Sequence, residues 1–196
     1  MTSIEDGMGS PPLTVACDTL MSSQPQFHTL FNYWKDVRNS AIVPPAASVD
    51  PASIPQLLKD ITILDLNTPD EIIYRLAGTA VAERTGMDPT GLNLLTLVPE
   101  HSRSFSSKTL FQVAQHPAGL VLEYENILRN GKRAEMESLY LPIQSATPNQ
   151  MRLISIHTVV RTIGFEDERP KPEFASVLHK LVWIDIGAGT PLDQQD

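Results

Sequence analysis

Residues 120–143, LVLEYENILRNGKRAEMESLYLPI, carry the strongest structural signal in the sequence. Asn130-Gly131 stands between two runs of alternating residues, which is typical of a β-hairpin with a two-residue type I′ turn. That turn would pair Leu122 with Leu139 and fix which side chains share a face. One face then carries only leucines: Leu120, Leu122, Leu139 and Leu141. The other face is mixed: Val121, Glu123, Glu125, Met136, Ser138 and Tyr140. We expect the leucine face to join the core and an amphipathic element to cover the mixed face.

The N-terminal part of the sequence offers that element. A helix is predicted over residues 25–40, because Pro25 suits a first turn and large apolar residues recur at helical spacing. They are Phe27, Leu30, Phe31, Trp34 and Val37. Pro44-Pro45 ends this helix, and Asp50-Pro51 predicts the start of a short one.

The remaining pattern indicates an α+β fold. Strands are predicted over 61–66 and 71–77, a short helix over 80–85, a longer helix over 100–115 and a last strand over 151–161. Two strands followed by helices and then three strands are typical of an antiparallel sheet with inserted helices.

Three segments are predicted along the chain. Residues 1–24 are rich in Ser, Thr, Gly and Pro and are predicted to be a flexible lead-in. Residues 25–162 form the domain. Residues 163–196 combine a charged, proline-interrupted linker with an apolar extension. Within that extension, residues 174–186 could form either a helix or an edge strand, and in both cases their apolar side needs a partner.

Composition excludes several classes of protein. The 23 acidic residues exceed the 15 Lys and Arg and give a formal net charge of −8, which opposes binding to nucleic acid. No apolar stretch is long enough for a membrane helix, and residues 1–7 do not resemble a signal peptide, so we expect a cytoplasmic protein. Cys17 is the single cysteine, which excludes an internal disulfide and a site made of several thiolates.

Several short motifs, in order, resemble a known family. They are Tyr33-Trp34 with Arg38, then Pro44-Pro45, residues 50–58 (DPASIPQLL), residues 74–79 (YRLAGT), Gly86 with Gly91, and residues 139–142 (LYLP). Over residues 27–162 the sequence resembles the bacterial stand-alone PAS domains, small single-PAS proteins of mostly unassigned role typified by a motility regulator. The resemblance implies a five-stranded antiparallel sheet with helices on one face around a small cavity. It also implies an N-terminal amphipathic helix, a homodimer and a sensory or adaptor role toward a partner protein.

Two sets of candidate residues follow from this interpretation. A cavity that could hold a small apolar ligand would be lined by Tyr74, Leu76, Phe105, Phe111, Leu122 and Leu139, with the phenol of Tyr74 as a polar handle. A packed core without a ligand remains the alternative. The dimer or interaction face would comprise Phe27, Leu30, Phe31, Trp34, Val37, Val121 and Tyr140.

No cofactor, metal or catalytic residue is expected. Covalent flavin chemistry in PAS light sensors needs a cysteine on the helix after the second strand, and Cys17 is in the lead-in. Haem would need an axial histidine, and His101, His116 and His157 are more typical of polar positions at helix ends and on a sheet. No zinc spacing and no nucleophile or nucleotide motif is present. We therefore expect a non-catalytic sensory module. The alternative is a small-molecule or haem-binding protein, or an enzyme of the α+β cone type in which Tyr74, His157 and an acid act.

Overall fold

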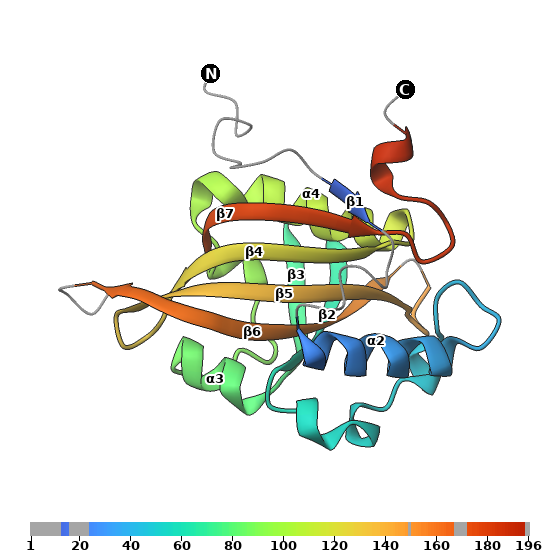
Figure 1. Ribbon diagram of the computed structural model, residues 1–196, viewed down its shortest axis with the longest axis horizontal. Coiled ribbons are helices and arrows are strands. Elements are labelled where there is room, and N and C mark those ends of the chain that lie inside the picture. Colours follow the sequence, from blue (N-terminus) through green and yellow to red (C-terminus); the bar gives the residue numbers. More distant parts are fainter. Residues whose placement is uncertain (1–12, 16–23, 149, 167–171, 195–196) are drawn as a thin grey trace.

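A seven-stranded sheet forms the centre of the molecule in the computed structural model, which describes residues 13–15, 24–148, 150–166 and 172–194 (Figure 1). The strand order is β1-β7-β4-β5-β6-β2-β3. The strands are β1 (Leu13–Val15), β2 (Ile61–Thr68), β3 (Glu71–Ala77), β4 (Gly119–Ile127), β5 (Lys132–Gln144), β6 (Met151–Phe165) and β7 (Glu173–Ile184). β1 joins β7 in parallel, and the other neighbouring strands are antiparallel.

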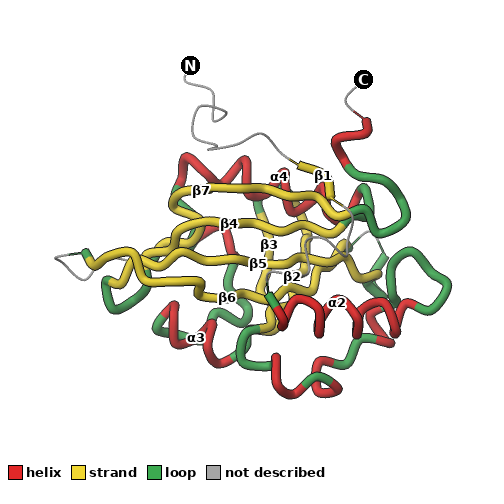
Figure 2. Tube along the Cα trace, viewed as in Figure 1, coloured by secondary structure: helices red, strands yellow, loops and turns green. Residues whose placement is uncertain are grey.

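Helices cover both faces of this sheet (Figures 1 and 2). α2 (Pro25–Arg38) lies against one face, whereas α3 (Thr79–Thr85) and α4 (Glu100–Gln115) lie on the other. Single turns of 3₁₀ helix occur at Ala46–Ser48, Pro51–Ser53, Pro55–Leu57, Leu94–Thr96 and Pro191–Gln194. The predicted α+β fold is confirmed, and its five expected strands form the run β4-β5-β6-β2-β3.

The short-range signals explain where several elements begin. Pro25 is the first residue of α2, where its missing N–H costs no hydrogen bond. Asp50 caps the turn that follows it, because its side chain accepts a hydrogen bond from the backbone N–H of Ala52 at 3.0 Å. Gly86 ends α3 in the left-handed conformation, with φ of 76°. The side chain of Arg129 packs where a Cβ on Gly86 would lie, which brings the β4–β5 hairpin against α3.

α2 packs its apolar stripe onto the sheet, as the sequence predicts. Phe27, Leu30, Phe31 and Trp34 are buried against a sheet face that includes Val121. The indole N–H of Trp34 donates a hydrogen bond to the carbonyl of Pro142 on β5 at 2.8 Å, which satisfies its buried donor. α2 is therefore an integral part of the core.

The hairpin at residues 128–132 differs from the prediction by one residue. The backbone N–H of Leu128 donates to the carbonyl of Lys132, and the N–H of Gly131 donates to the carbonyl of Leu128. Residues 128 and 132 therefore close the hairpin, and the loop between them contains three residues. Gly131 has φ of 79°, whereas Asn130 is not among the residues with positive φ. Because a type I′ turn needs positive φ at both positions, the loop takes the three-residue form with a bulge at glycine. The register becomes Val121 with Leu139, which places the leucines expected to share a face on opposite faces.

The C-terminal extension completes the sheet. β7 pairs along nearly the whole of β4, which decides between the two predicted forms of residues 174–186 in favour of a strand. The side chains of its last residues are buried on both faces of the sheet. Val182 and Ile184 lie beneath α2, and Leu181 and Trp183 lie on the α4 side. Of the predicted lead-in, Leu13–Val15 form β1 against this strand, and the rest of residues 1–23, including Cys17, lies outside the described residues.

None of the helices in the described part of the chain has the length and hydropathy that crossing a bilayer requires.

Candidate functional site

A cavity of about 540 Å³ lies between the sheet and the two helices on its α4 side. Its walls come from β3, α3, α4, β4, β5, β6 and the first residues of β7. Most of the wall is apolar: Val81, Leu94, Val98, Phe105, Leu110, Leu122, Met136 and Phe174. A cavity of this size and character is typical of a small-molecule site.

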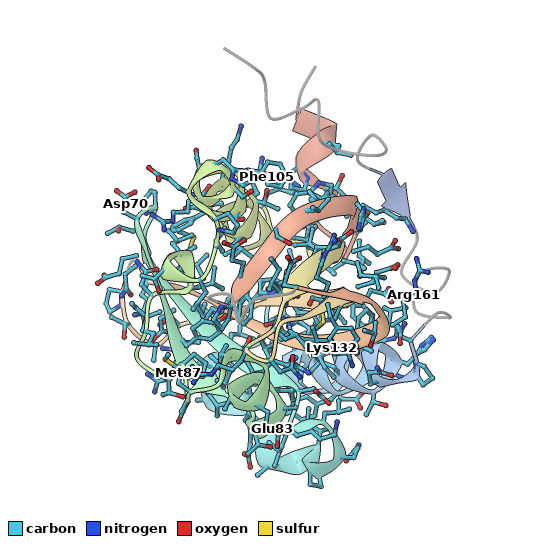
Figure 3. The ribbon with its side chains drawn as sticks, turned by 90° about the vertical axis from the view of Figure 1, so that its left-hand side faces the viewer. Asp70, Glu83, Met87, Phe105, Lys132 and Arg161 are labelled. Atoms are coloured by element: carbon cyan, nitrogen blue, oxygen red, sulfur yellow. The ribbon has the colours of Figure 1, made fainter. Side chains whose placement is uncertain are left out.

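The cavity meets the surface between α4 and the start of β7. His101, in the first turn of α4, and Val177, on β7, are exposed although both belong to the lining. Figure 3 views this side of the molecule and shows Phe105 on α4 close to the start of β7. The backbone N–H of Phe174 donates to the carbonyl of Leu97 at 2.8 Å and attaches β7 to the segment before α4. β7 therefore forms one wall of the opening.

A network of hydroxyl groups surrounds one imidazole at the sheet side of the cavity. Ser138 Oγ lies 2.7 Å from Nδ1 of His157 and 2.7 Å from the hydroxyl of Tyr124. The other ring nitrogen of His157 lies 3.1 Å from Thr62 Oγ1 and 3.2 Å from Ser155 Oγ. Both ring nitrogens thus have hydrogen-bond partners, and no carboxylate is among those partners.

The electrostatic surroundings keep this network uncharged. Burial lowers the pKa of His157 to about 3, and the nearby positive charge of Arg84 acts in the same direction, against Asp60. Burial also raises the pKa values of Tyr74, Tyr124 and Tyr140 above those of free phenols. At neutral pH the site therefore contains a neutral imidazole and protonated phenols.

Three of the six predicted cavity residues lie in the lining: Tyr74, Phe105 and Leu122. Leu139 packs beneath α2 instead, because the one-residue change in hairpin register turns it to the other face. Leu76 also packs on the α2 side, since the bulge at Arg75 interrupts the alternation after Tyr74. Phe111 is buried in the α4-side core but is not part of the cavity wall.

Most residues of the predicted interaction face are buried within the single chain. The α2 residues Phe27, Leu30, Phe31 and Trp34 are 0–3% exposed within a single chain, and Val121 is buried with them. Val37 is partly exposed, and Tyr140 lines the cavity on the opposite face. An interface built from these side chains would need α2 to leave the sheet.

Arg84, Tyr124 and Ser138 were missed as site residues. Ser138 and Tyr140 are adjacent to Leu139 and move to the cavity side with the same change of register. Arg84 lies on α3, whose sequence carries no signal for the cavity it faces. The signal that could have indicated the correct face is Asn130-Gly131 itself. The same two residues also fit a three-residue loop with glycine at its last position, and that loop gives the observed register.

No metal centre is present among the described residues, where no three His, Cys, Asp or Glu side chains gather in a suitable arrangement. Among the three histidines considered for haem, His101 is exposed at the cavity opening, and His116 at the end of α4 does not line the cavity. His157 lines it with both ring nitrogens engaged by hydroxyl groups.

The order and position of these elements match a known domain. A family model for the PAS domain matches residues 21–158, which is more than half of the chain. The chain belongs to the PAS domain family. The five-strand run β4-β5-β6-β2-β3 lies almost wholly inside the match, while β7 and the end of β6 follow it. A search of curated proteins found no match. PAS domains are sensory or interaction modules. The cavity described here lies between the sheet and the helices α3 and α4, and the added strand β7 forms part of its wall.

Proposed function

We propose that this PAS protein is a non-catalytic sensory and interaction module that binds a small, mainly apolar ligand and thereby regulates a partner protein. The observation that carries the proposal is the cavity of about 540 Å³, with apolar walls and a few convergent polar groups. A packed core would leave no such volume, because protein interiors contain few voids larger than a water molecule.

Filling the cavity tests this proposal. Ser106 on α4 lines the cavity and is partly exposed, so Ser106→Trp should place an indole inside without crowding a buried site. The matched control is Ser104→Trp, on the exposed side of the same helix. We expect a neutral apolar dye such as Nile red to bind the natural protein and the control, and to bind Ser106→Trp about tenfold more weakly or not at all.

Native mass spectrometry of protein purified from its own host supplies the second readout. A mass above that of the chain, lost in Ser106→Trp, would support a retained ligand. Chain mass alone, together with equal dye binding by both variants, would refute the sensory half of the proposal.

The cavity wall suggests how occupancy reaches a partner. Phe174, Ser176 and Leu178 on β7 line the cavity, and β7 lies next to the sheet edge. A ligand that contacts this wall changes the stability of β7 and so the edge that a partner meets. Hydrogen exchange with and without ligand should show altered protection over residues 173–184. Equal protection in both states would refute this route.

We also propose that the protein forms a homodimer through the outer part of β6. β2 pairs with β6 only up to Ile156, and beyond it the described residues leave that edge of β6 without a strand partner. Four apolar side chains there are exposed: Val159, Val160, Ile163 and Phe165. Arg161, the charged residue among them, pairs with Glu135 at 2.6 Å, so two copies would not repel each other. Sedimentation equilibrium should show a dimer that Val160→Lys weakens. A monomer at high concentration would refute this.

The chain's own residues favour binding over catalysis. Ser138 and His157 are close enough for a nucleophile and a base, but Ser138 Oγ also contacts the Tyr124 hydroxyl and His157 contacts no carboxylate. We therefore propose that the protein has no hydrolytic activity and no haem. Absence of p-nitrophenyl ester hydrolysis above that of the His157→Gln variant, and absence of a Soret band in the purified protein, are the expected results.

A further inference from the structure

One buried hydrogen-bond donor at the cavity, Nη2 of Arg84, has no acceptor within the described residues. The hydroxyl of Tyr74, a residue that is 3% exposed and lines the cavity, makes no hydrogen bond there. Arg84 donates through Nη1 to Asp60 at 3.2 Å, while its Nη2 is buried without a partner. Buried donors without acceptors are rare because each costs free energy.

These two donors lie in one neighbourhood. Arg84 and Tyr74 line the same cavity, together with Tyr124 and His157. Ser138 joins two of the other polar groups, the Tyr124 hydroxyl and the His157 ring, by hydrogen bonds. The Tyr74 hydroxyl and Nη2 of Arg84 are donors that this network does not use.

The local charge favours an anion. Asp60 is shared between two cations, since Lys59 Nζ lies 2.6 Å from one carboxylate oxygen and Arg84 Nη1 lies 3.2 Å from the other. Among the described residues that line the cavity, none is an aspartate or a glutamate. Arg84 thus shares its carboxylate partner with the exposed Lys59, and the cavity lining itself supplies no negative charge.

We propose that the cavity binds a small carboxylic acid with an apolar body, whose carboxylate accepts hydrogen bonds from the hydroxyl of Tyr74 and Nη2 of Arg84. The planar guanidinium group and a carboxylate match in geometry, and a phenol that stays protonated donates to either oxygen. The apolar body lies against Leu94, Leu122 and Met136. This inference rests on the proposed ligand-binding function and specifies its ligand class.

Isothermal titration with matched probes tests the charge preference. Decanoate, 1-decanol and decyltrimethylammonium share one alkyl chain and differ in head group. We expect decanoate to bind at least about tenfold more tightly than 1-decanol, and decyltrimethylammonium to bind most weakly of the three. 4-Phenylbutyrate, compared with decanoate, distinguishes an aryl from an alkyl body with the same carboxylate.

Variants assign the preference to the two residues. Tyr74→Phe removes only the hydroxyl and Arg84→Gln removes the charge, and each should weaken decanoate binding about tenfold while leaving 1-decanol binding unchanged. The controls are Tyr33→Phe and Arg75→Gln, which alter a phenol and a guanidinium group outside the cavity lining. Both should bind decanoate as the natural protein does. Tyr74→Phe keeps the ring, so it remains informative if Arg84→Gln does not fold.

The outcomes separate this inference from the function on which it rests. If 1-decanol binds as tightly as decanoate, or if neither variant changes the ratio of the two affinities, the carboxylic acid assignment is overturned and the apolar cavity remains. If none of the probes or the dye binds, both proposals are overturned.

Discussion

Ser138 Oγ and Nδ1 of His157 lie 2.7 Å apart on directly paired residues of β5 and β6. This contact joins the imidazole to the hydroxyl of Tyr124, and the other ring nitrogen reaches Thr62 and Ser155. Hydroxyl-bearing side chains from four strands are thus arranged around one neutral ring on the cavity side of the sheet. Such a network is stabilising only while the ring stays neutral, because a second ring proton would face oxygen atoms already engaged with each other.

The first prediction concerns the pH dependence of stability. The pKa of His157 falls from 6.5 to about 3 in the folded protein, so between these values the unfolded chain binds a proton that the folded protein does not. The free energy of unfolding should therefore fall as pH is lowered through this window, by up to about 1.4 kcal/mol per pH unit.

Urea denaturation from about pH 7 to about pH 5, where carboxylates change little, measures this slope. His157→Gln should be less stable at neutral pH and should lose most of the slope. An equal slope in the variant would show that other groups cause it.

A second prediction concerns the buried ion pair between β2 and β6. Arg152 Nε donates to Asp65 at 2.5 Å, and both residues are 8% exposed. Arg152→Met leaves the buried carboxylate without this partner and should cost about 3 kcal/mol or more in unfolding free energy.

The matched control is Arg161→Met, which removes an arginine of the same strand from an exposed pair with Glu135. It should cost at most about 1 kcal/mol. The double variant Asp65→Leu with Arg152→Leu should recover much of the unfolding free energy lost in Arg152→Met. Equal effects of the two single arginine variants would contradict the role of burial.

A third prediction tests whether β7 unfolds with the PAS core. Trp183 is buried on the α4 side of β7, and Trp34, a residue of α2, is buried against the other face of the sheet. Because these are the two tryptophans of the chain, Trp183→Ala leaves Trp34 to report on α2. We expect the free energy of unfolding, followed by Trp34 fluorescence, to fall by about 3–5 kcal/mol in this variant.

Val177→Ala, at a position 42% exposed on the same strand, should change stability by less than about 0.5 kcal/mol. An unchanged Trp34 transition in Trp183→Ala would mean that β7 is not part of the cooperative unit.

A fourth prediction concerns the loop that sets the hairpin register. Gly131 has φ of 79°, so Gly131→Ala should lower the unfolding free energy by about 1–2 kcal/mol. Gly164 on β6 has no positive φ, and a methyl group added there would meet open space, so Gly164→Ala should have an effect within about 0.5 kcal/mol. Both are measured by urea denaturation. Equal effects would argue against the left-handed position at Gly131.

Local patterns were enough to predict most elements of this protein. The stripe from Phe27 to Trp34 predicted both α2 and its burial, because large apolar residues on one side of a helix must pack against something. The alternating runs on either side of Asn130-Gly131 predicted β4 and β5, and the order of elements predicted the PAS fold.

Single-residue details in the backbone decided the candidate site. The bulge at Arg75 and the three-residue loop at Gly131 each moved neighbouring side chains to the other face of the sheet. Leu76 and Leu139 thereby left the cavity side, and Tyr140 and Ser138 joined it. A period-two pattern cannot reveal such changes, because one inserted residue reverses all the alternation that follows it.

The sequence by itself determined the kind of fold, because hydrophobic periodicity and turn residues act over a few neighbours. Only the tertiary structure decided that residues 173–184 complete the sheet and that Arg84, Tyr74 and His157 meet at one cavity. These residues are far apart in the chain, and their meeting depends on strand register and on the packing of α3 against the hairpin, which local preferences do not specify.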